Sequence, residues 1–242
     1  MNQKAKKLGL KNTNFKNATG LDIANHYSSA YDMSVMAREL VKHEKILEFS
    51  SKYEDYLRQD TNQKFWLVNT NKLLKVYDGM DGLKTGYTKE AGYCLTATAK
   101  KKGMRLIGVV MGEETSTTRN DEMKELLDYG FNLYEVKNLV SKDKSLGKYK
   151  NSKMKSSDIN IVPSESISIL NKKGSKKRKI SYKVNVTKNK LPIKKNEKIG
   201  YLNIYEKGNR IFKIDVTVDK DVKKANLVEL YLKNLSNFFV KD

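Results

Sequence analysis

The chain has 242 residues, of which 38% are hydrophobic and 31% are charged, so it can form one large domain or two modest ones with a true core. Lys and Arg outnumber Asp and Glu by 48 to 28, which predicts attraction to nucleic acid, anionic lipid or an anionic wall polymer, or else only a solvated lysine-rich surface. A single cysteine, Cys94, excludes an intrachain disulfide, and with only His26 and His43 the sequence predicts no metal site and no cofactor.

Two helices are predicted in the first half of the chain. The first begins at Ser29, whose spacing to Asp32 fits a capping box, and its apolar stripe consists of Met33, Met36, Leu40 and Leu47. The second begins near Thr118, with Asp121 at the matching position, and extends to about Glu135 with a stripe of Met123, Leu126, Leu127 and Tyr134.

The segment between these helices reads as a series of strands with short connections. Turn residues occur at Asp78-Gly79, Asp81-Gly82 and Lys102-Gly103, and the predicted strands are Leu67–Leu74, Gly79–Thr85, Tyr93–Ala99 and Leu106–Met111. Short connections favour antiparallel pairing, so we expect an α+β domain with helices against an antiparallel sheet. The last of these strands is continuously apolar, and we expect it at the centre of the sheet.

Beyond Ser141 the sequence becomes rich in Lys, Ser and Asn and predicts a small β-rich domain. Short alternating runs cover Ile159–Val162, Ile167–Leu170, Ile180–Val186, Ile199–Tyr205 and Ile211–Val218. The final segment returns to helical spacing with lysines on its polar side. The expected domains are therefore residues 1–140, a β-rich domain over 141–221 and an amphipathic helical tail over 222–242.

One motif in the first domain carries chemistry. Lys84-Thr85-Gly86 closes a predicted strand, and it resembles the third motif of penicillin-binding proteins and serine β-lactamases. The segments around it resemble, in order, those of low-molecular-mass D-alanyl-D-alanine carboxypeptidases, peptidase family S11: Leu8-Gly9-Leu10, Thr13, Phe15, Asn17, Gly20-Leu21-Asp22, Tyr27 to Met33, Gly103 to Ile107 and Val110-Met111-Gly112. Residues 191–200 resemble a segment of the β-rich C-terminal domain in the same family.

The resemblance implies a fold and a site. The fold is the C-terminal part of a β-lactamase/transpeptidase-like catalytic domain, followed by a β-rich domain that holds the catalytic part away from the membrane. Lys84 and Thr85 would bind the carboxylate of a peptide or a β-lactam, and Gly86 would leave room for the substrate beside the strand. Arg119, at the start of the second predicted helix, would bind the same carboxylate through two parallel hydrogen bonds, unless it is a solvated surface residue.

The same resemblance implies a nucleophilic serine in an S-x-x-K motif and a middle S-x-N motif, both upstream of Lys84. No serine in the chain is followed by asparagine two residues later, and Ser141, Ser145 and Ser152, each with lysine three residues on, all lie downstream. Residues after Met1 do not form a signal peptide, and no stretch approaches the roughly 18 apolar residues of a membrane-spanning helix. We therefore expect that the chain starts inside the catalytic domain, with Met1 an internal methionine.

In the intact family enzyme, the serine would attack the bond between two D-alanines of a peptidoglycan stem peptide, form an acyl-enzyme and release D-alanine. The implied location is outside the cytoplasmic membrane, with β-lactams as inhibitors and with the 222–242 helix in contact with the membrane surface or docked on its own domain. An alternative is a non-catalytic module that binds the cell wall. A nucleic-acid binder is disfavoured, because the lysine runs at 172–173 and 176–179 lack interleaved aromatic residues for base stacking.

Overall fold

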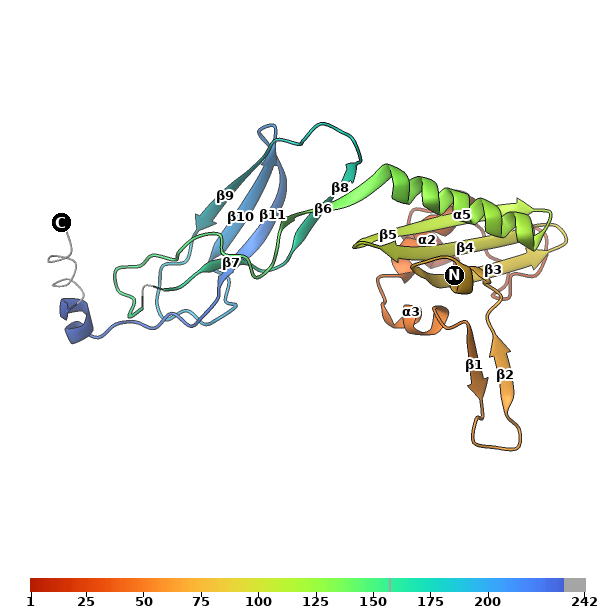
Figure 1. The fold of residues 1–242 in the computed structure, drawn as a ribbon, viewed down its shortest axis with the longest axis horizontal. Coiled ribbons are helices and arrows are strands. Elements are labelled where there is room, and N and C mark those ends of the chain that lie inside the picture. Colours follow the sequence, from red (N-terminus) through yellow and green to blue (C-terminus); the bar gives the residue numbers. More distant parts are fainter. Residues whose placement is uncertain (157, 233–242) are drawn as a thin grey trace. The chain divides into compact units, whose positions relative to one another are not determined.

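The computed structural model of the protein describes residues 1–156 and 158–232, which fall into two compact units, Met1–Glu135 and Val136–Asp242 (Figure 1). The division lies five residues before the boundary expected after residue 140. The reason is strand β6 (Tyr134–Val140), which pairs with β8 (Ile167–Lys172) and so belongs with the second unit.

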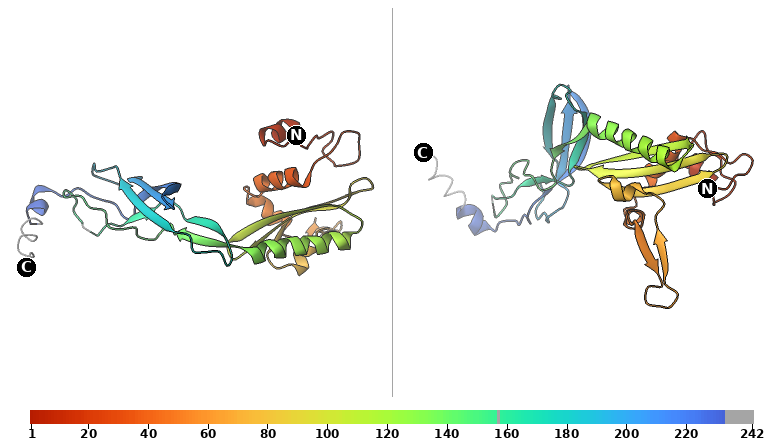
Figure 2. Two further views of the ribbon diagram at one scale, coloured as in Figure 1. Left: turned by 90° about the horizontal axis from the view of Figure 1, so that it is seen from above. Right: turned by 45° about the vertical axis from the view of Figure 1, so that its right-hand side comes forward.

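The first unit is an antiparallel sheet with helices on both faces. The strand order is β3-β4-β5, from β3 (Met80–Thr88), β4 (Gly92–Lys101) and β5 (Met104–Glu113). Figure 1 shows α5 (Ser116–Leu133) along one face, and Figure 2 shows α2 (Ala30–Leu40) on the other. The core under α5 contains Leu73, Tyr77, Met80, Leu95, Ala97, Ala99, Met123 and Leu127.

Three of the expected strands form, but the place expected for the last of them is wrong. The turn between β4 and β5 is made by Lys102 and Gly103, which have φ of 49° and 79°, the left-handed pair that a two-residue hairpin requires. In the described residues β5 pairs only with β4 and forms an edge of the sheet. Its continuous apolar run instead reflects helices packed on both of its faces, since α2 and α5 both contact it.

The two expected helices form with different limits. Ser29 caps α2 and its hydroxyl accepts from the Asp32 amide, but the helix ends at Leu40, and Leu47 lies in a separate helix, α3 (Lys45–Ser50). The apolar stripe stays in phase across the intervening turn, so spacing alone cannot separate one helix from two. The N-cap of helix α5 lies three residues earlier than expected, because Thr115 takes this position and its hydroxyl accepts from the Thr118 amide at 3.0 Å.

The strand expected over Leu67–Leu74 is wrong in its second half. Residues Phe65–Val68 form β2, which pairs with β1 (Glu54–Leu57) in a separate hairpin, whereas Leu73–Val76 form the short helix α4. The Asn71 side chain accepts a hydrogen bond from the Leu73 amide at 3.2 Å, a local contact that starts a helical turn. A further short helix, α1 (Asn2–Lys7), opens the chain.

An ion pair ties the two outer strands of the sheet together. On β5 the Arg105 guanidinium donates through Nη1 and Nη2 to the two carboxylate oxygens of Asp81 on β3, both at 2.7 Å. Nη1 also donates to the Thr98 hydroxyl of β4, at 2.8 Å, so a single side chain contacts all three strands. About three quarters of each charged side chain is buried, which makes this a stronger contact than an exposed pair.

A second buried carboxylate organises the segment before α2. Asp32 is 1% exposed and accepts from the Asn12 amide and the Thr13 hydroxyl, each at 2.7 Å. Thr13 also hydrogen-bonds Ser28, and Asn14 pairs with Tyr27 as an isolated bridge. These contacts close residues 12–32 into a defined loop beside the sheet.

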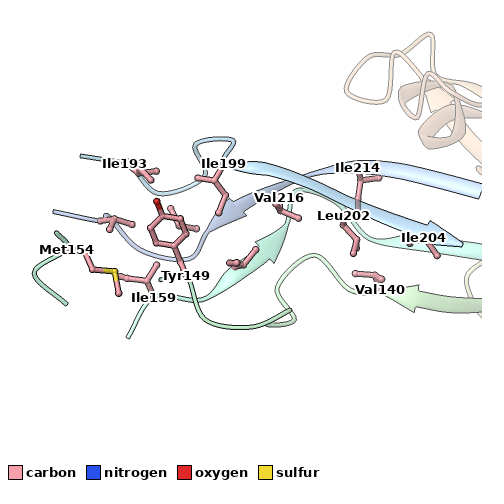
Figure 3. Packing of buried hydrophobic residues seen from close by; sticks show 13 residues of the cluster. Val140, Tyr149, Met154, Ile159, Ile193, Ile199, Leu202, Ile204, Ile214 and Val216 are labelled. Atoms are coloured by element: carbon pink, nitrogen blue, oxygen red, sulfur yellow. The ribbon is translucent and has the colours of Figure 1, made fainter. Parts of the chain in front are cut away.

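The second unit is built from short antiparallel strands. Its larger sheet has the order β7-β11-β10-β9, from Ile161–Pro163, Asn209–Val218, Gly200–Glu206 and Ile180–Val186 respectively. Each of the five strand runs expected here overlaps a strand of the structure. Figure 3 shows the inward side chains that form one core, which includes Tyr149 and Met154 from the long connection between β6 and β7 together with Ile193, Ile199, Leu202 and Val216.

The tail predicted as one helix over 222–242 is only partly helical where it is described. Val222 bridges to Ile193 and Lys224 to Met154, so this stretch is extended, and residues 227–232 are helical. Asn226 and Glu229 form a reciprocal cap at the start of that helix. Residues 233–242 of the predicted tail lie outside the described residues. In the described part of the chain, no helix combines the length and apolar character needed to cross a bilayer.

We expect Arg105→Lys to lower the stability of the first unit by about 1–2 kcal/mol, because a lysine ammonium cannot match both carboxylate oxygens and the Thr98 hydroxyl at once. Arg58→Lys is the matched control, since Arg58 is exposed and its guanidinium donates to the exposed Gln63 side chain. Urea unfolding followed by near-UV circular dichroism measures the stability of both variants. Equal unfolding midpoints would show that the two-pronged Arg105–Asp81 ion pair does not contribute to stability.

Candidate active site

The Lys84-Thr85-Gly86 motif lies in the second half of β3, where the strand is exposed on one side. The pairing of β3 with β4 places Thr85 opposite Leu95 and Gly86 opposite Cys94. A Cβ added to Gly86 would meet only Cys94 Cβ, at 3.9 Å, and its φ is not positive. Neither backbone conformation nor packing inside the described chain requires glycine here, so its effect is to leave space beside the strand.

The motif side chains are oriented by near neighbours. The Thr85 hydroxyl hydrogen-bonds the Thr70 hydroxyl at 2.6 Å, which links β3 to the loop between β2 and α4. The Lys84 ammonium is exposed and donates to the Thr85 carbonyl at 2.7 Å. Both polar groups therefore stay on the strand surface.

Arg119 lies on the first turn of α5 and is 4% exposed. Its Nε and Nη2 donate to the Asn120 amide oxygen at 3.2 and 2.9 Å, and among the described residues no carboxylate pairs with it. Burial lowers the pKa of the Arg119 guanidinium, and the nearby side chains of Cys94 and Tyr93 act in the opposite direction. A buried cation without a carboxylate partner at a helix N-terminus is unfavourable unless an anion binds beside it.

All four residues singled out from the sequence, Lys84, Thr85, Gly86 and Arg119, line one cavity of about 860 Å³ in the first unit. The fold brings them together because α5 starts above the part of β4, Tyr93-Cys94, that pairs with the end of the motif. The cavity thus combines two cations, a hydroxyl and a helix N-terminus, the donor set that suits a carboxylate.

Sequence reasoning missed two residues of this cavity. Thr70 and Asn120 line it and orient Thr85 and Arg119 through the hydrogen bonds above. Asn120 follows Arg119 directly, but nothing in a helical pattern shows which neighbour turns back to the guanidinium. Thr70 lies 15 residues before its partner, in a segment expected to be a strand.

Two other residues considered from the sequence also line the cavity. His26 accepts the Lys16 amide through Nδ1 at 3.0 Å and packs edge-on against Phe15, which is a structural role. Cys94 is half-buried, with its sulfur 3.4 Å from the Ala91 carbonyl oxygen. Ser141, Ser145 and Ser152 all belong to the second unit. In the described part of the chain, no three His, Cys, Asp or Glu side chains gather as a metal site would need.

Comparison with known proteins finds a matching domain for each unit. Residues 1–115 match the family model for D-alanyl-D-alanine carboxypeptidase, and residues 134–224 match that for the C-terminal domain of penicillin-binding protein 5. The chain is 47% identical to the D-alanyl-D-alanine carboxypeptidase DacF of Bacillus subtilis over 98% of its own length, and 32% identical to DacA of Escherichia coli over 93%. It covers 61% and 56% of these two relatives.

The solved structures give the same result. The chain superposes on penicillin-binding protein 5 from Haemophilus influenzae with a TM-score of 0.58 and 30% identity, over 92% of its own length and 64% of that protein. The α+β fold and the β-rich second domain expected from the sequence are thereby confirmed. The chain belongs to the D-alanyl-D-alanine carboxypeptidases, peptidase family S11 of the low-molecular-mass penicillin-binding proteins, and joins part of their catalytic domain to their β-rich C-terminal domain.

Proposed function

We propose that the first unit supplies the carboxylate-binding wall of a serine D-Ala-D-Ala carboxypeptidase that trims the terminal D-alanine from peptidoglycan stem peptides and is inhibited by β-lactams. The observation that carries this proposal is the cavity that Lys84, Thr85 and buried Arg119 all line, in which Arg119 has no carboxylate partner in the described residues. The natural anion for this cavity is the C-terminal carboxylate of the peptide. The substrate and its polymer place the activity outside the cytoplasmic membrane.

The chemistry divides between residues that bind and residues that react. Lys84, Thr85 and Arg119 bind and orient the carboxylate, and Gly86 leaves the edge of β3 free for the peptide to lie along it. An S-x-x-K motif would supply the serine that forms the acyl-enzyme and the lysine that takes its proton. These 242 residues contain no such motif upstream of Lys84. Bond cleavage therefore requires a segment that carries them.

We expect no covalent label when this chain alone is incubated with a fluorescent penicillin, because its 242 residues contain no S-x-x-K motif upstream of Lys84. A chimera in which the serine-bearing segment of the Bacillus subtilis relative precedes residue 1 should be labelled on one serine of that added segment. Mass spectrometry of the tryptic peptides locates the adduct. An adduct on Ser141, Ser145 or Ser152 would contradict the inference that this chain has no serine able to react with a penicillin.

In that chimera, Arg119→Ala should lower kcat/KM for a D-Ala-D-Ala peptide roughly 10- to 100-fold, the usual effect of removing hydrogen bonds to a charged group. Lys124→Ala is the control, since it removes a cation from the exposed side of the same helix, where Lys124 pairs with Asp121. Amidating the terminal carboxylate should weaken the parent far more than it weakens Arg119→Ala. Independent, additive losses would place Arg119 outside contact with the carboxylate.

Thr85→Val should also impair cleavage, because it removes one hydroxyl at nearly constant volume. Thr70→Val separates the two explanations for such a loss, since it breaks the same Thr70–Thr85 hydrogen bond but keeps the Thr85 hydroxyl. We expect the loss in kcat/KM for Thr85→Val to exceed that for Thr70→Val by at least about tenfold. Equal losses would mean that Thr85 only fastens the β2–α4 loop.

A further inference from the structure

The basic character of the chain is concentrated in its second unit. Residues 136–242 contain 27 Lys and Arg against 10 Asp and Glu, whereas residues 1–135 contain 21 against 18. The excess positive charge is thus not a uniform property of the surface. A solvated lysine-rich surface alone does not explain why one domain carries nearly all of it.

Within the second unit, many of these cations meet at one end of the larger sheet. The connection from β8 to β9, residues 171–179, and the turn from β10 to β11, residues 207–210, lie side by side there. The Lys207 amide donates to the Lys179 carbonyl at 3.4 Å, and Glu206 pairs with Ile180 across β10 and β9. We call these two segments the basic tip.

One ion pair holds the two segments of the basic tip together. Arg178 donates through Nε and Nη2 to both carboxylate oxygens of Glu206, the residue directly before the second segment. In the described residues, six further side chains of the tip are exposed and form no salt bridge: Lys172, Lys176, Lys177, Lys179, Lys207 and Arg210. Repulsion among them has a cost that a bound anion would remove.

The opposite end of the same sheet has the contrary arrangement. Asp158 pairs with Lys148 and Lys220, and Glu197 pairs with Lys188. Asp219, which follows β11, accepts from the Asn160 amide and side chain. This end therefore holds several acidic residues among its lysines, whereas the two segments of the basic tip contain none.

The composition of the tip indicates what could bind there. Residues 171–179 and 207–210 include no apolar and no aromatic side chain. Binding in a membrane interface uses apolar side chains beside the basic ones, and binding of single-stranded nucleic acid uses aromatic side chains for stacking. A tip of cations alone instead suits a ligand that is recognised by repeated charge.

We propose that the basic tip binds a flexible polyanion that carries phosphate groups at intervals along its chain and offers neither bases nor acyl chains. Several lysines on two adjacent turns can follow such a chain, and each phosphate neutralised releases a counterion. This surface is separate from the cavity of the first unit and does not depend on the carboxypeptidase proposal.

The test uses the whole chain with fluorescently labelled linear polyphosphate as the probe, followed by fluorescence anisotropy over a range of salt concentrations. The tip variant changes Lys176, Lys177, Lys179 and Lys207 to Gln. The control variant makes the same change in net charge at the opposite end of the sheet. It changes four exposed lysines that form no salt bridge in the described residues: Lys194, Lys195, Lys223 and Lys224. Thermal unfolding verifies that both variants fold.

We expect the tip variant to raise the Kd for polyphosphate at least about tenfold and to flatten the salt dependence, with less than about a threefold change in the control. Equal losses in the two variants would overturn the proposal in favour of diffuse net charge. Tip-dependent binding that is tighter to phosphatidylglycerol vesicles or to single-stranded DNA would overturn the choice of ligand. Acetylation mapping of the parent chain gives an independent readout, because polyphosphate should protect the tip lysines before the control lysines.

Discussion

The antiparallel register of β3 against β4, held by the Asp81–Arg105 fork, is the constraint on which the cavity depends. That register places Gly86 opposite Cys94 and Tyr87 opposite Tyr93, the same part of β4 over which α5 begins. Because side chains alternate along a strand, a slip of one residue would turn Thr85 to the other face of the sheet. Arg105 contacts β3 and β4 from β5 and opposes such a slip at the start of the motif strand.

The buried guanidinium of Arg119 lowers the stability of the first unit at the same cavity. Burying a cation without a counterion costs free energy, and a helix N-terminus adds to that cost. The protein offsets part of it with two hydrogen bonds to Asn120 but supplies no carboxylate in the described residues. A cation kept in this condition is already desolvated and oriented, so an incoming carboxylate finds its partner without displacing an internal one. The same arrangement favours anions over neutral ligands.

The sequence predicted an element of the fold well where contacts between residues close in the chain determine it. The strands of the second unit alternate with clear turn residues, and their ranges were predicted closely. Local capping chemistry also placed Ser29 at the start of α2. The errors arose where a distant partner decides. The apolar run of β5 arises because helices cover both of its faces, although the strand lies at the edge of the sheet. Leu47 fits the apolar spacing of α2 but belongs to the next helix, because spacing does not reveal the turn between them.

The cations of the two units should respond differently to their surroundings, because one set is buried and the other is exposed. Arg119 is 4% exposed, so mobile ions screen its charge weakly. The lysines of the basic tip lie in water, and a Debye length of about 8 Å at physiological ionic strength limits each of them to near neighbours. Their effect therefore requires many charges close together, which two adjacent turns provide. Specific recognition of one carboxylate needs few buried donors, and retention of a charged polymer needs many exposed ones, so the two tasks are suited to separate domains of one chain.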